Sequence, residues 1–394
     1  MKIGIMNYIF RIIETNLRQI LHWGKSVLLL GPRQTGKTTL LKQFPVDLTI
    51  SFANPLVRRR YEQNLNLLYD EIKALSNKQP RVIIDEVQKI PEILDAVQDL
   101  IDKGLAQFIL TGSSARKLRQ PKINWLPGRV INLHLDPLMF SELPLDKLDL
   151  TLLLYYGSLP EVVLTEDVDK KTLLLDSYTS LYLEEEIRTE AAVRNVARFT
   201  EFLSLAAAES GNIINFSKLS QELGISRKTI ADYFQILEDC LIVEKVSAYS
   251  TTKTRRRLTK SDKYIFFDLG VKRLAQYAGV DQVRDIQGRL FEELIGIELV
   301  RCCRLLKERA KVYYWRDSSG PEVDWLVEQN NQLIAYEVKL KETPAQQDIK
   351  HLKIFMSEHP SCKRAYVVCQ TPNAFQLDEN ITAIPWQKLV DTLG

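Results

Sequence analysis

Ser26-Val27-Leu28-Leu29-Leu30-Gly31-Pro32-Arg33-Gln34-Thr35-Gly36-Lys37-Thr38-Thr39-Leu40 is the stretch of sequence that decides the fold. An apolar run typical of a buried strand leads directly into a glycine-rich turn, and the spacing of Leu40, Leu41 and Phe44 after the turn predicts a helix. The segment satisfies the pattern G-x-x-x-x-G-K-[ST] with the strand before it and the helix after it that this pattern requires. The sequence therefore predicts an α/β domain whose parallel sheet carries a phosphate-binding loop.

The residue types of this loop suit a nucleoside triphosphate. Gly31 and Gly36 allow the backbone to curl until several N–H groups point inward, backed by the positive end of the following helix. Lys37 is expected to reach the β- and γ-phosphates, and Thr38 to ligate Mg²⁺. The alternative is a turn that needs glycine for its conformation alone. We predict that ATP and Mg²⁺ are bound here, by Gly31, Pro32, Arg33, Gln34, Thr35, Gly36, Lys37, Thr38 and Thr39.

A second motif supplies the acids that hydrolysis needs. Arg81-Val82-Ile83-Ile84-Asp85-Glu86 is a short apolar run ending in two carboxylates, as expected of a central parallel strand that delivers side chains to the carboxyl edge of a sheet. Asp85 is expected to hold Mg²⁺, and Glu86 to polarise the attacking water. An acid pair that only caps a strand is the alternative. We predict that Asp85 and Glu86 are catalytic.

Further polar groups are candidates for contact with the γ-phosphate. Residues 107–114 predict a strand that ends in hydroxyls and lies between the phosphate-loop strand and the acidic strand, so Thr111 or Ser113 is a candidate sensor, although a Gly-Ser turn needs no function. Arg129 follows a Pro-Gly turn at the head of the next predicted strand. It is either a surface arginine or a catalytic one, offered to the γ-phosphate in cis or from a neighbouring subunit.

Length and composition bound the remaining possibilities. The 394 residues allow two or three domains, and an apolar fraction of 45% can fill their cores. The net charge of +3 does not by itself indicate a nucleic-acid partner. The five cysteines form no C-x-x-C pair and the four histidines are scattered, so we expect neither disulfides nor a zinc site.

The first residues show an amphipathic helix pattern. Ile9, Ile12, Ile13 and Leu17 have helical spacing, but Arg11 and other charged residues interrupt the apolar run. This pattern is not typical of a signal peptide or of a membrane span. We therefore expect a cytoplasmic protein without membrane contact.

Residues 199–268 predict a winged helix. Residues 216–223, the turn Gly224-Ile225 and residues 226–237 read as helix, turn and helix, and residues 241–246 with 264–267 supply two strands of a wing. The expected wing tip is basic, because it carries Lys253, Arg255, Arg256, Arg257, Lys260 and Lys263.

These charges favour DNA as the partner. A phosphate-contacting wing needs basic residues among hydroxyls, and the second helix offers Arg227, Lys228 and Thr229 to a groove. A winged helix that docks a protein, or a solvated hairpin tip, is the alternative. The expected DNA contacts are Arg227, Lys228, Lys253, Arg255, Arg256 and Arg257.

The carboxyl-terminal part carries a second constellation of acids. Residues 313–316, 322–328 and 334–340 read as strands, and Glu337 and Lys339 share one face because strand side chains alternate. Asp324 on a neighbouring strand can join Glu337 around a hard cation, with Glu292 reaching over from a helix. Carboxylates suit Mg²⁺, and an adjacent lysine can orient or activate water beside a phosphodiester. A surface Glu-x-Lys ion pair is the alternative.

A family resemblance covers nearly the whole chain. The motifs Gly-Pro-Arg-Gln-Thr-Gly-Lys-Thr-Thr-Leu, Ile-Ile-Asp-Glu-Val-Gln-Lys-Ile-Pro, Leu-Thr-Gly-Ser-Ser and Leu-Pro-Gly-Arg, with Tyr-Gly-Ser-Leu-Pro-Glu further on, resemble prokaryotic AAA-type ATPases that pair AAA_14 with DUF4143. The resemblance implies an ATPase domain, a helical segment, a winged helix and a domain with a PD-(D/E)XK nuclease-like core. Glu292, Asp324, Glu337 and Lys339 match that core residue by residue, and the same fold also occurs in domains that bind without cleaving.

The sequence thus predicts four parts: a P-loop ATPase core at 1–137, a helical lid or linker at 138–198, a winged helix at 199–268 and a small α/β nuclease-like domain at 269–394. The preferred hypothesis is an ATPase whose nucleotide state controls the winged helix and the nuclease-like domain on DNA. Two alternatives are a Mg²⁺-dependent DNA nuclease gated by ATP and a regulatory switch that binds proteins and does not cleave. A homo-oligomer or a protein partner is also left open.

Overall fold

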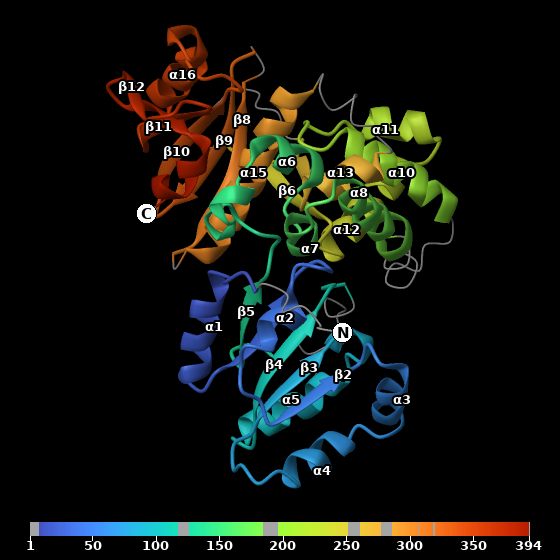
Figure 1. Ribbon diagram of the computed structural model, residues 1–394. Coiled ribbons are helices and arrows are strands. Elements are labelled where there is room, and N and C mark those ends of the chain that lie inside the picture. Colours follow the sequence, from blue (N-terminus) through green and yellow to red (C-terminus); the bar gives the residue numbers. More distant parts are fainter. Residues whose placement is uncertain are drawn as a thin grey trace.

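The computed structural model describes residues 8–116, 126–183, 196–250, 261–276, 286–306, 308–317 and 320–393. The chain forms two bodies, one above the other in Figure 1. The lower body holds the five-stranded sheet and its helices, up to the end of β5. The upper body holds the later elements, including the eight-stranded sheet. No helix among these described residues is long and apolar enough to cross a membrane.

The lower sheet is parallel throughout, in the order β2-β3-β4-β1-β5. Its strands are β1 (Ser26–Leu30), β2 (Leu48–Ser51), β3 (Arg81–Asp85), β4 (Gln107–Gly112) and β5 (Val130–His134). The predicted position of residues 107–112 is confirmed, because β4 pairs with β1 on one side and with β3 on the other. All five strands therefore end at the same edge, where the phosphate loop and the two acids follow β1 and β3.

Helices cover both faces of this sheet, because side chains alternate along each strand. Val82 and Ile84 pack with α3 (Pro55–Gln63), α4 (Leu67–Lys73) and α5 (Ile93–Asp102), whereas Ile83 packs with α1 (Ile13–His22) and α2 (Lys37–Leu41). The segment between β2 and β3 forms two helices, α3 and α4, with a break at Asn64. Asn64 ends α3 in an extended conformation, and its side chain accepts a hydrogen bond from the Asn66 N–H at 3.1 Å.

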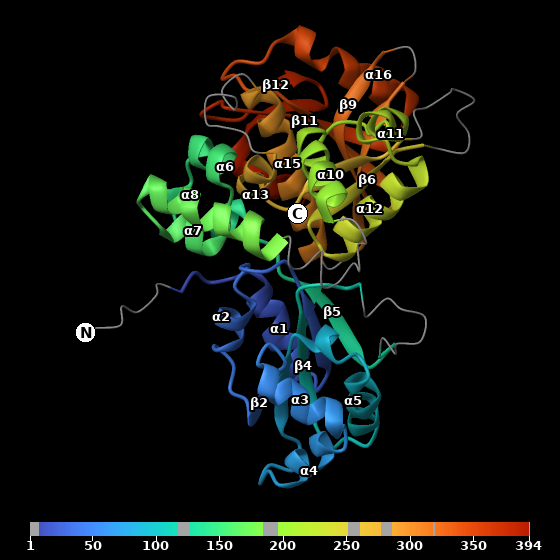
Figure 2. The same ribbon diagram turned by 90° about the vertical axis from the view of Figure 1, so that its right-hand side faces the viewer.

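The predicted helical lid is part of the upper body. Its helices are α6 (Leu150–Tyr156), α7 (Pro160–Leu164) and α8 (Val168–Ser177), followed by a π-helical turn, Tyr178–Leu183. Their buried residues share one hydrophobic core with α13 (Leu269–Ala275) and α15 (Gln287–Leu305). Figure 2 shows α6, α7 and α8 together beside α13. The lid and the carboxyl-terminal elements therefore form one packed unit.

A helix-turn-helix unit lies beside this core. It consists of α10 (Val196–Ala208), α11 (Phe216–Leu223), α12 (Arg227–Asp239) and the antiparallel strands β6 (Val243–Ala248) and β7 (Lys263–Phe266). Gly224 has a positive φ of 63° at the end of α11, where glycine avoids strain. The Ser226 hydroxyl caps α12 by accepting a hydrogen bond from the Thr229 N–H at 3.1 Å. The helices lie where the sequence predicts them.

The upper sheet has eight strands in the order β12-β13-β11-β10-β9-β8-β6-β7. The strands not yet given are β8 (Ala310–Arg316), β9 (Glu322–Gln329), β10 (Gln332–Val338), β11 (Cys362–Cys369), β12 (Phe375–Asp378) and β13 (Ile381–Pro385). Helix α15 covers one face and α16 (Lys350–Glu358) the other. Because β6 pairs with β8, the sheet crosses the proposed domain boundary at residue 268 without a break.

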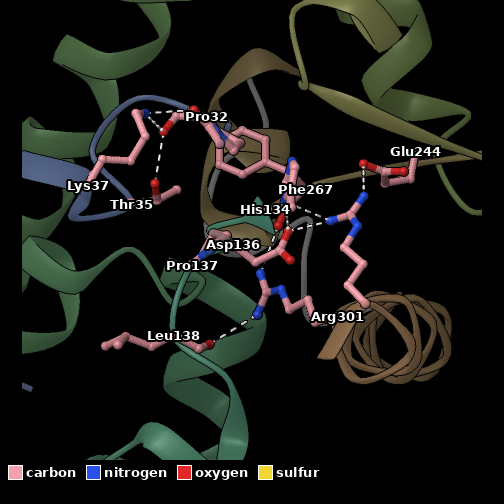
Figure 3. Close-up of polar contacts among 12 residues, drawn as sticks. Pro32, Thr35, Lys37, His134, Asp136, Pro137, Leu138, Glu244, Phe267 and Arg301 are labelled. Carbon is pink, nitrogen blue, oxygen red and sulfur yellow. Dashed lines mark hydrogen bonds and ion pairs between the residues drawn. The ribbon is translucent and has the colours of Figure 1, made fainter. Parts of the chain in front are cut away.

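Buried charges join the two bodies where the chain leaves β5 (Figure 3). The Arg304 guanidinium on α15 bonds the Asp136 carboxylate at 2.5 Å and also pairs with Glu244 of β6. Burial opposes the charged form of Asp136, but the Arg304 guanidinium, with smaller effects from His134 and Arg301, outweighs burial and holds the pKa of this carboxyl well below its usual range. Arg301, also on α15, donates to the carbonyl oxygen of Leu138 at 3.0 Å.

The substitution Asp136→Asn should lower the free energy of unfolding by about 3 kcal/mol, because it leaves a partly buried guanidinium without its charge partner. Since the pKa of Asp136 is lowered on folding, its contribution is complete above about pH 4 and is lost as the pH falls toward the folded-state value. Urea unfolding from pH 3 to pH 7 measures both effects. Asp146→Asn, on an exposed aspartate, is the control and should change the unfolding free energy little. Equal unfolding of the two variants at pH 7 would contradict this account.

Candidate nucleotide site and carboxylate centre

The phosphate loop connects β1 to α2 and is shaped by its two glycines. A Cβ atom on Gly31 would lie 2.3 Å from the Leu135 carbonyl oxygen, so only glycine fits beside β5. Gly36 precedes α2 with a positive φ of 96°. The Lys37 ammonium donates to the carbonyl oxygens of Gly31 at 2.6 Å and Pro32 at 2.8 Å, across the loop (Figure 3). The two glycines thus shape the loop and the lysine is held across it, and these residue types fit a triphosphate.

Arg11 supports this loop, and the sequence analysis did not identify it as a site residue. Its side chain is buried and donates to the carbonyl oxygens of Thr35 at 2.7 Å and Asp136 at 2.7 Å, and to the Glu142 carboxylate at 3.0 Å. One guanidinium therefore connects the phosphate loop, the end of β5 and the entry to the lid. Its interruption of an apolar helical pattern was the only sequence signal for this role.

The two acids lie beside the loop at the carboxyl end of β3, next to the end of β4. The Asp85 carboxylate accepts hydrogen bonds from the hydroxyls of Thr111 and, at 3.1 Å, Ser51. The Glu86 carboxylate accepts from the Ser113 hydroxyl at 3.0 Å and from the Gln88 amide at 2.6 Å. Both sensor candidates therefore contact the acid pair. Gln88, which the sequence analysis did not single out, is a further partner of Glu86.

A cavity of about 300 Å³ contains these groups. Its lining includes Lys37, Thr38, Asp85 and Glu86 of the lower body. Residues of the upper body and of the segment before α1 also line it, namely Tyr8, Ile9, Leu138, Pro160, Glu161 and Leu164. The lining thus combines polar groups suited to phosphates and Mg²⁺ with apolar groups suited to a base. The residues present fit a magnesium nucleotide held between the two bodies.

Arg129 does not reach this site within the same chain, so the cis reading of its role is wrong. It directly precedes β5, whose first residue, Val130, pairs with Ser26 at the start of β1. The phosphate loop follows the other end of β1, about 17 Å away at the usual rise of a strand. The Arg129 guanidinium instead forms an exposed ion pair with Asp102 at 2.8 Å.

Asp324, Glu337 and Lys339 form a second site, here called the carboxylate centre. The Lys339 ammonium donates to the Glu337 carboxylate at 2.6 Å, so these two side chains share a face, as predicted. One Asp324 oxygen accepts from the Val338 N–H at 2.8 Å. The other Glu337 oxygen, Oε2, is buried and makes no hydrogen bond within the described part of the chain.

Burial controls the electrostatics of this centre. It raises the pKa of Asp324 well above the usual value, and the carboxylates of Glu292 and Glu337 raise it further. It also raises the pKa of Glu337 to about 7, against the opposing charge of Lys339. Two such buried carboxyl groups, close to one another, provide oxygen ligands of the kind that a hard cation prefers.

The predicted metal ligand Glu292 has a different partner. Its carboxylate pairs with the Lys263 ammonium at 3.1 Å. Across the residues that the structure describes, no three His, Cys, Asp or Glu side chains are arranged to hold a metal ion. The predicted set of Glu292, Asp324 and Glu337 is therefore not assembled as a metal site, although its members are close enough to affect one another's charge.

The predicted DNA contacts fall into two groups. Arg227 and Lys228 are exposed in the first turn of α12, so this helix presents them to solvent. Lys253, Arg255, Arg256 and Arg257, the predicted wing tip, lie outside the described residues.

The site and its sheet define a P-loop nucleoside triphosphatase fold: β1 carries the phosphate loop, β3 carries the acids and β4 lies between them. Three family models divide the chain. An AAA domain (AAA_14) matches residues 24–144, and domains of unknown function match residues 147–282 (DUF8612) and 287–389 (DUF4143). The chain thus combines an AAA domain with a DUF4143 domain, as the sequence resemblance implied.

Relatives that this chain covers over about four fifths of their length occur in bacteria and archaea. An uncharacterized protein of Mycobacterium tuberculosis is 25% identical over 384 residues, covering 95% of this chain and 83% of the relative. An uncharacterized protein of Methanocaldococcus jannaschii is 25% identical over 372 residues, covering 86% and 80%.

Solved structures resemble the chain more distantly. A Walker-type ATPase of Pyrococcus abyssi is 14% identical, with a TM-score of 0.46 and coverage of 70% of this chain and 98% of that one. The Aeropyrum pernix ORC1 protein in complex with DNA is 12% identical, with a TM-score of 0.33 and coverage of 72% and 94%.

Proposed function

We propose that this protein binds and hydrolyses ATP with Mg²⁺, and that its nucleotide state controls the helix-turn-helix unit and the carboxyl-terminal sheet domain on DNA. Lys37 and Thr38 bind the phosphates and the metal, Asp85 holds the metal and Glu86 polarises water. The observation that carries the proposal is a direct contact between the end of β4, beside Glu86, and the end of α12.

This contact begins at Ser114, which directly follows Ser113, the residue that bonds Glu86. Ser113 donates to the Glu86 carboxylate, and the next two residues bond to α12: the Ser114 hydroxyl and the Ala115 N–H donate to the Asp239 carbonyl oxygen at 3.3 and 2.9 Å. A displacement of Glu86 around a γ-phosphate would therefore also displace Asp239, the last residue of α12.

Helix α12 can pass such a movement on. It is 13 residues long, from Arg227 to Asp239, and so extends about 20 Å. Its far end presents Arg227 and Lys228, the described candidates for DNA contact. The other route is the nucleotide cavity itself, since Pro160, Glu161 and Leu164 of α7 line it and α7 packs in the core of the upper body.

DNA should therefore stimulate ATP hydrolysis by the full chain, and the variant Arg227→Ala/Lys228→Ala should lose most of that stimulation while keeping its basal rate. The loss follows from fewer phosphate contacts, so it should be largest at moderate salt. The measurement is steady-state ATP hydrolysis with and without duplex and single-stranded DNA.

The matched control is Lys363→Ala/Arg364→Ala, which removes the same charges from exposed positions of β11. It should keep the full stimulation. A basal rate that no DNA changes, in otherwise active protein, would refute the proposed control by DNA and leave the ATPase assignment intact.

A second candidate function is Mg²⁺-dependent cleavage of DNA at the carboxylate centre, gated by ATP. The specific observation in its favour is that Lys339 bonds the buried Glu337 carboxylate while a second buried carboxyl group, Asp324 of β9, lies close enough to affect the charge of both. The carboxylates can hold Mg²⁺, and the lysine can orient water toward a phosphodiester.

A further inference from the structure

Lys263 is a buried cation that the helix-turn-helix unit places beside the carboxylate centre. It is the first residue of β7, and its backbone is paired with Val246 of β6 and with Ile213 before α11. The residue is only 8% exposed. A lysine this well buried needs a strong electrostatic environment to remain charged.

That environment consists of a carboxylate and two aromatic rings. The Lys263 ammonium lies 3.1 Å from the Glu292 carboxylate, 4.8 Å from the centre of the Trp325 ring and 5.2 Å from that of Tyr314. Carboxylates and ring faces are the groups that stabilise a desolvated cation. The positive charge of Lys263 also acts on Asp324, whose pKa it lowers against the larger effects of burial and of Glu292.

The packing around this lysine is tight. The Trp325 indole donates to the backbone oxygen of Glu292 at 2.9 Å, which ties β9 to α15. A Cβ atom on Gly296 of α15 would lie 2.3 Å from the same indole, so helix and ring touch directly. Glu292 therefore sits at a fixed point above the carboxylate centre, with Lys263 as its partner.

From this arrangement we infer that Lys263 is a resident cation that keeps a divalent metal out of the carboxylate centre. Its ammonium satisfies Glu292 and supplies positive charge close to Asp324. Glu292 is then not available to complete a metal site with Asp324 and with Glu337, whose Oε2 atom has no hydrogen bond within the described chain. The inference deepens the proposed control of the carboxyl-terminal domain, on which it rests, because Lys263 belongs to the helix-turn-helix unit.

Because their charges repel, the Lys263 ammonium and a divalent metal ion cannot both occupy this site. Unlike charges a few ångströms apart in a buried site attract strongly, and a divalent ion brought to the same carboxylates would repel the ammonium by a comparable amount. Lys263 and Glu292 line a polar cavity of about 150 Å³, together with Arg289, Arg316 and Glu322 among others, so ions from solvent have access to Glu292. Withdrawal of β7 would release Glu292 to the metal.

The test is Mn²⁺ binding to the nucleotide-free full chain, followed by calorimetry and by the loss of free Mn²⁺ signal in electron paramagnetic resonance. Lys263→Met, which keeps the length of the side chain without its charge, should bind Mn²⁺ about tenfold or more tightly than the wild type. Lys263→Gln should do the same, and it serves if the methionine variant is insoluble. Lys263→Arg keeps the charge and should resemble the wild type.

A second substitution locates the metal. Adding Asp324→Ala to Lys263→Met should abolish the gain, because the new ion sits on the carboxylate centre and not at Asp85. Unchanged Mn²⁺ affinity in both neutral variants, or a gain that survives Asp324→Ala, would overturn the inference. Neither result depends on ATP turnover, so failure here is distinguishable from failure of the proposed ATPase function, which the DNA-stimulated hydrolysis rate tests separately.

Discussion

Lys37→Ala should reduce ATP hydrolysis by about 100-fold or more, with a matching loss of ATP affinity. The Lys37 ammonium is buried and is held across the loop by the carbonyl oxygens of Gly31 and Pro32, so it is already positioned where β- and γ-phosphate oxygens would replace those carbonyls. Removal of one such preorganised donor from a water-excluded site costs two to three orders of magnitude in rate in other enzymes, so about 100-fold is the lower bound expected here.

Steady-state hydrolysis and calorimetric titration with ATP measure the two effects. Lys42→Ala is the matched control, because Lys42 follows the same helix and is exposed. It should leave both quantities unchanged. If Lys37→Ala hydrolysed ATP at the wild-type rate, the loop would not be the nucleotide site and the proposed function would fail.

Glu86→Gln should separate binding from hydrolysis. The amide keeps the size of the side chain but cannot accept a proton, so turnover should fall by about 100-fold while ATP affinity stays near that of the wild type. Gln88 and Ser113 should still bond the neutral side chain. Both donate to the same oxygen of Glu86, Oε2, and the amide oxygen of glutamine can accept these bonds in its place. Rapid mixing with ATP, followed by single-turnover hydrolysis, measures the chemical step directly.

Glu92→Gln is the control for this substitution. Glu92 is exposed before α5, where its side chain makes no capping bond. A Glu86→Gln protein that turns over ATP normally would show that another group positions the water. A protein that instead loses ATP affinity would show that Glu86 acts in binding, contrary to the role assigned here.

The sequence predicted the lower body well because its signals are local. An apolar run, a glycine turn and a helix pattern specify β1, the loop and α2 within 15 residues, and the acids at the end of β3 are similarly placed by a short motif. The break between α3 and α4 also has a local cause, because the Asn64 side chain accepts a hydrogen bond from the Asn66 N–H where the first helix ends.

The predicted cis role of Arg129 could have been rejected from the direction of the strands alone. A residue that precedes a parallel strand lies at the amino edge of the sheet, whereas the phosphate loop lies at the carboxyl edge. The Pro-Gly turn before β5 therefore positions Arg129 away from the nucleotide, and its nearest carboxylate is Asp102 at the end of α5. The trans role, from a neighbouring subunit, stays a prediction.

The missed site residues depend on contacts between distant parts of the chain. Arg11 bonds Thr35, Asp136 and Glu142, which no periodic pattern connects to it. Lys263 was expected among the wing-tip cations, but it faces Glu292, a residue 29 positions later in the sequence. Likewise, the pairing of Ser247 and Ala248 with Tyr313 and Tyr314 joins two predicted domains through one sheet, and composition gives no sign of it.

The segment from His134 to Leu138 connects the two bodies and lies against the phosphate loop. It is where the backbone goes from one body to the other, and it begins against the loop, because the Leu135 N–H bonds to Leu30 and its carbonyl oxygen fills the space beside Gly31. A rotation of the upper body would thus pivot at the wall of the nucleotide cavity itself. On the proposed control by nucleotide, a small displacement of the loop would therefore produce a larger displacement at the far end of α12.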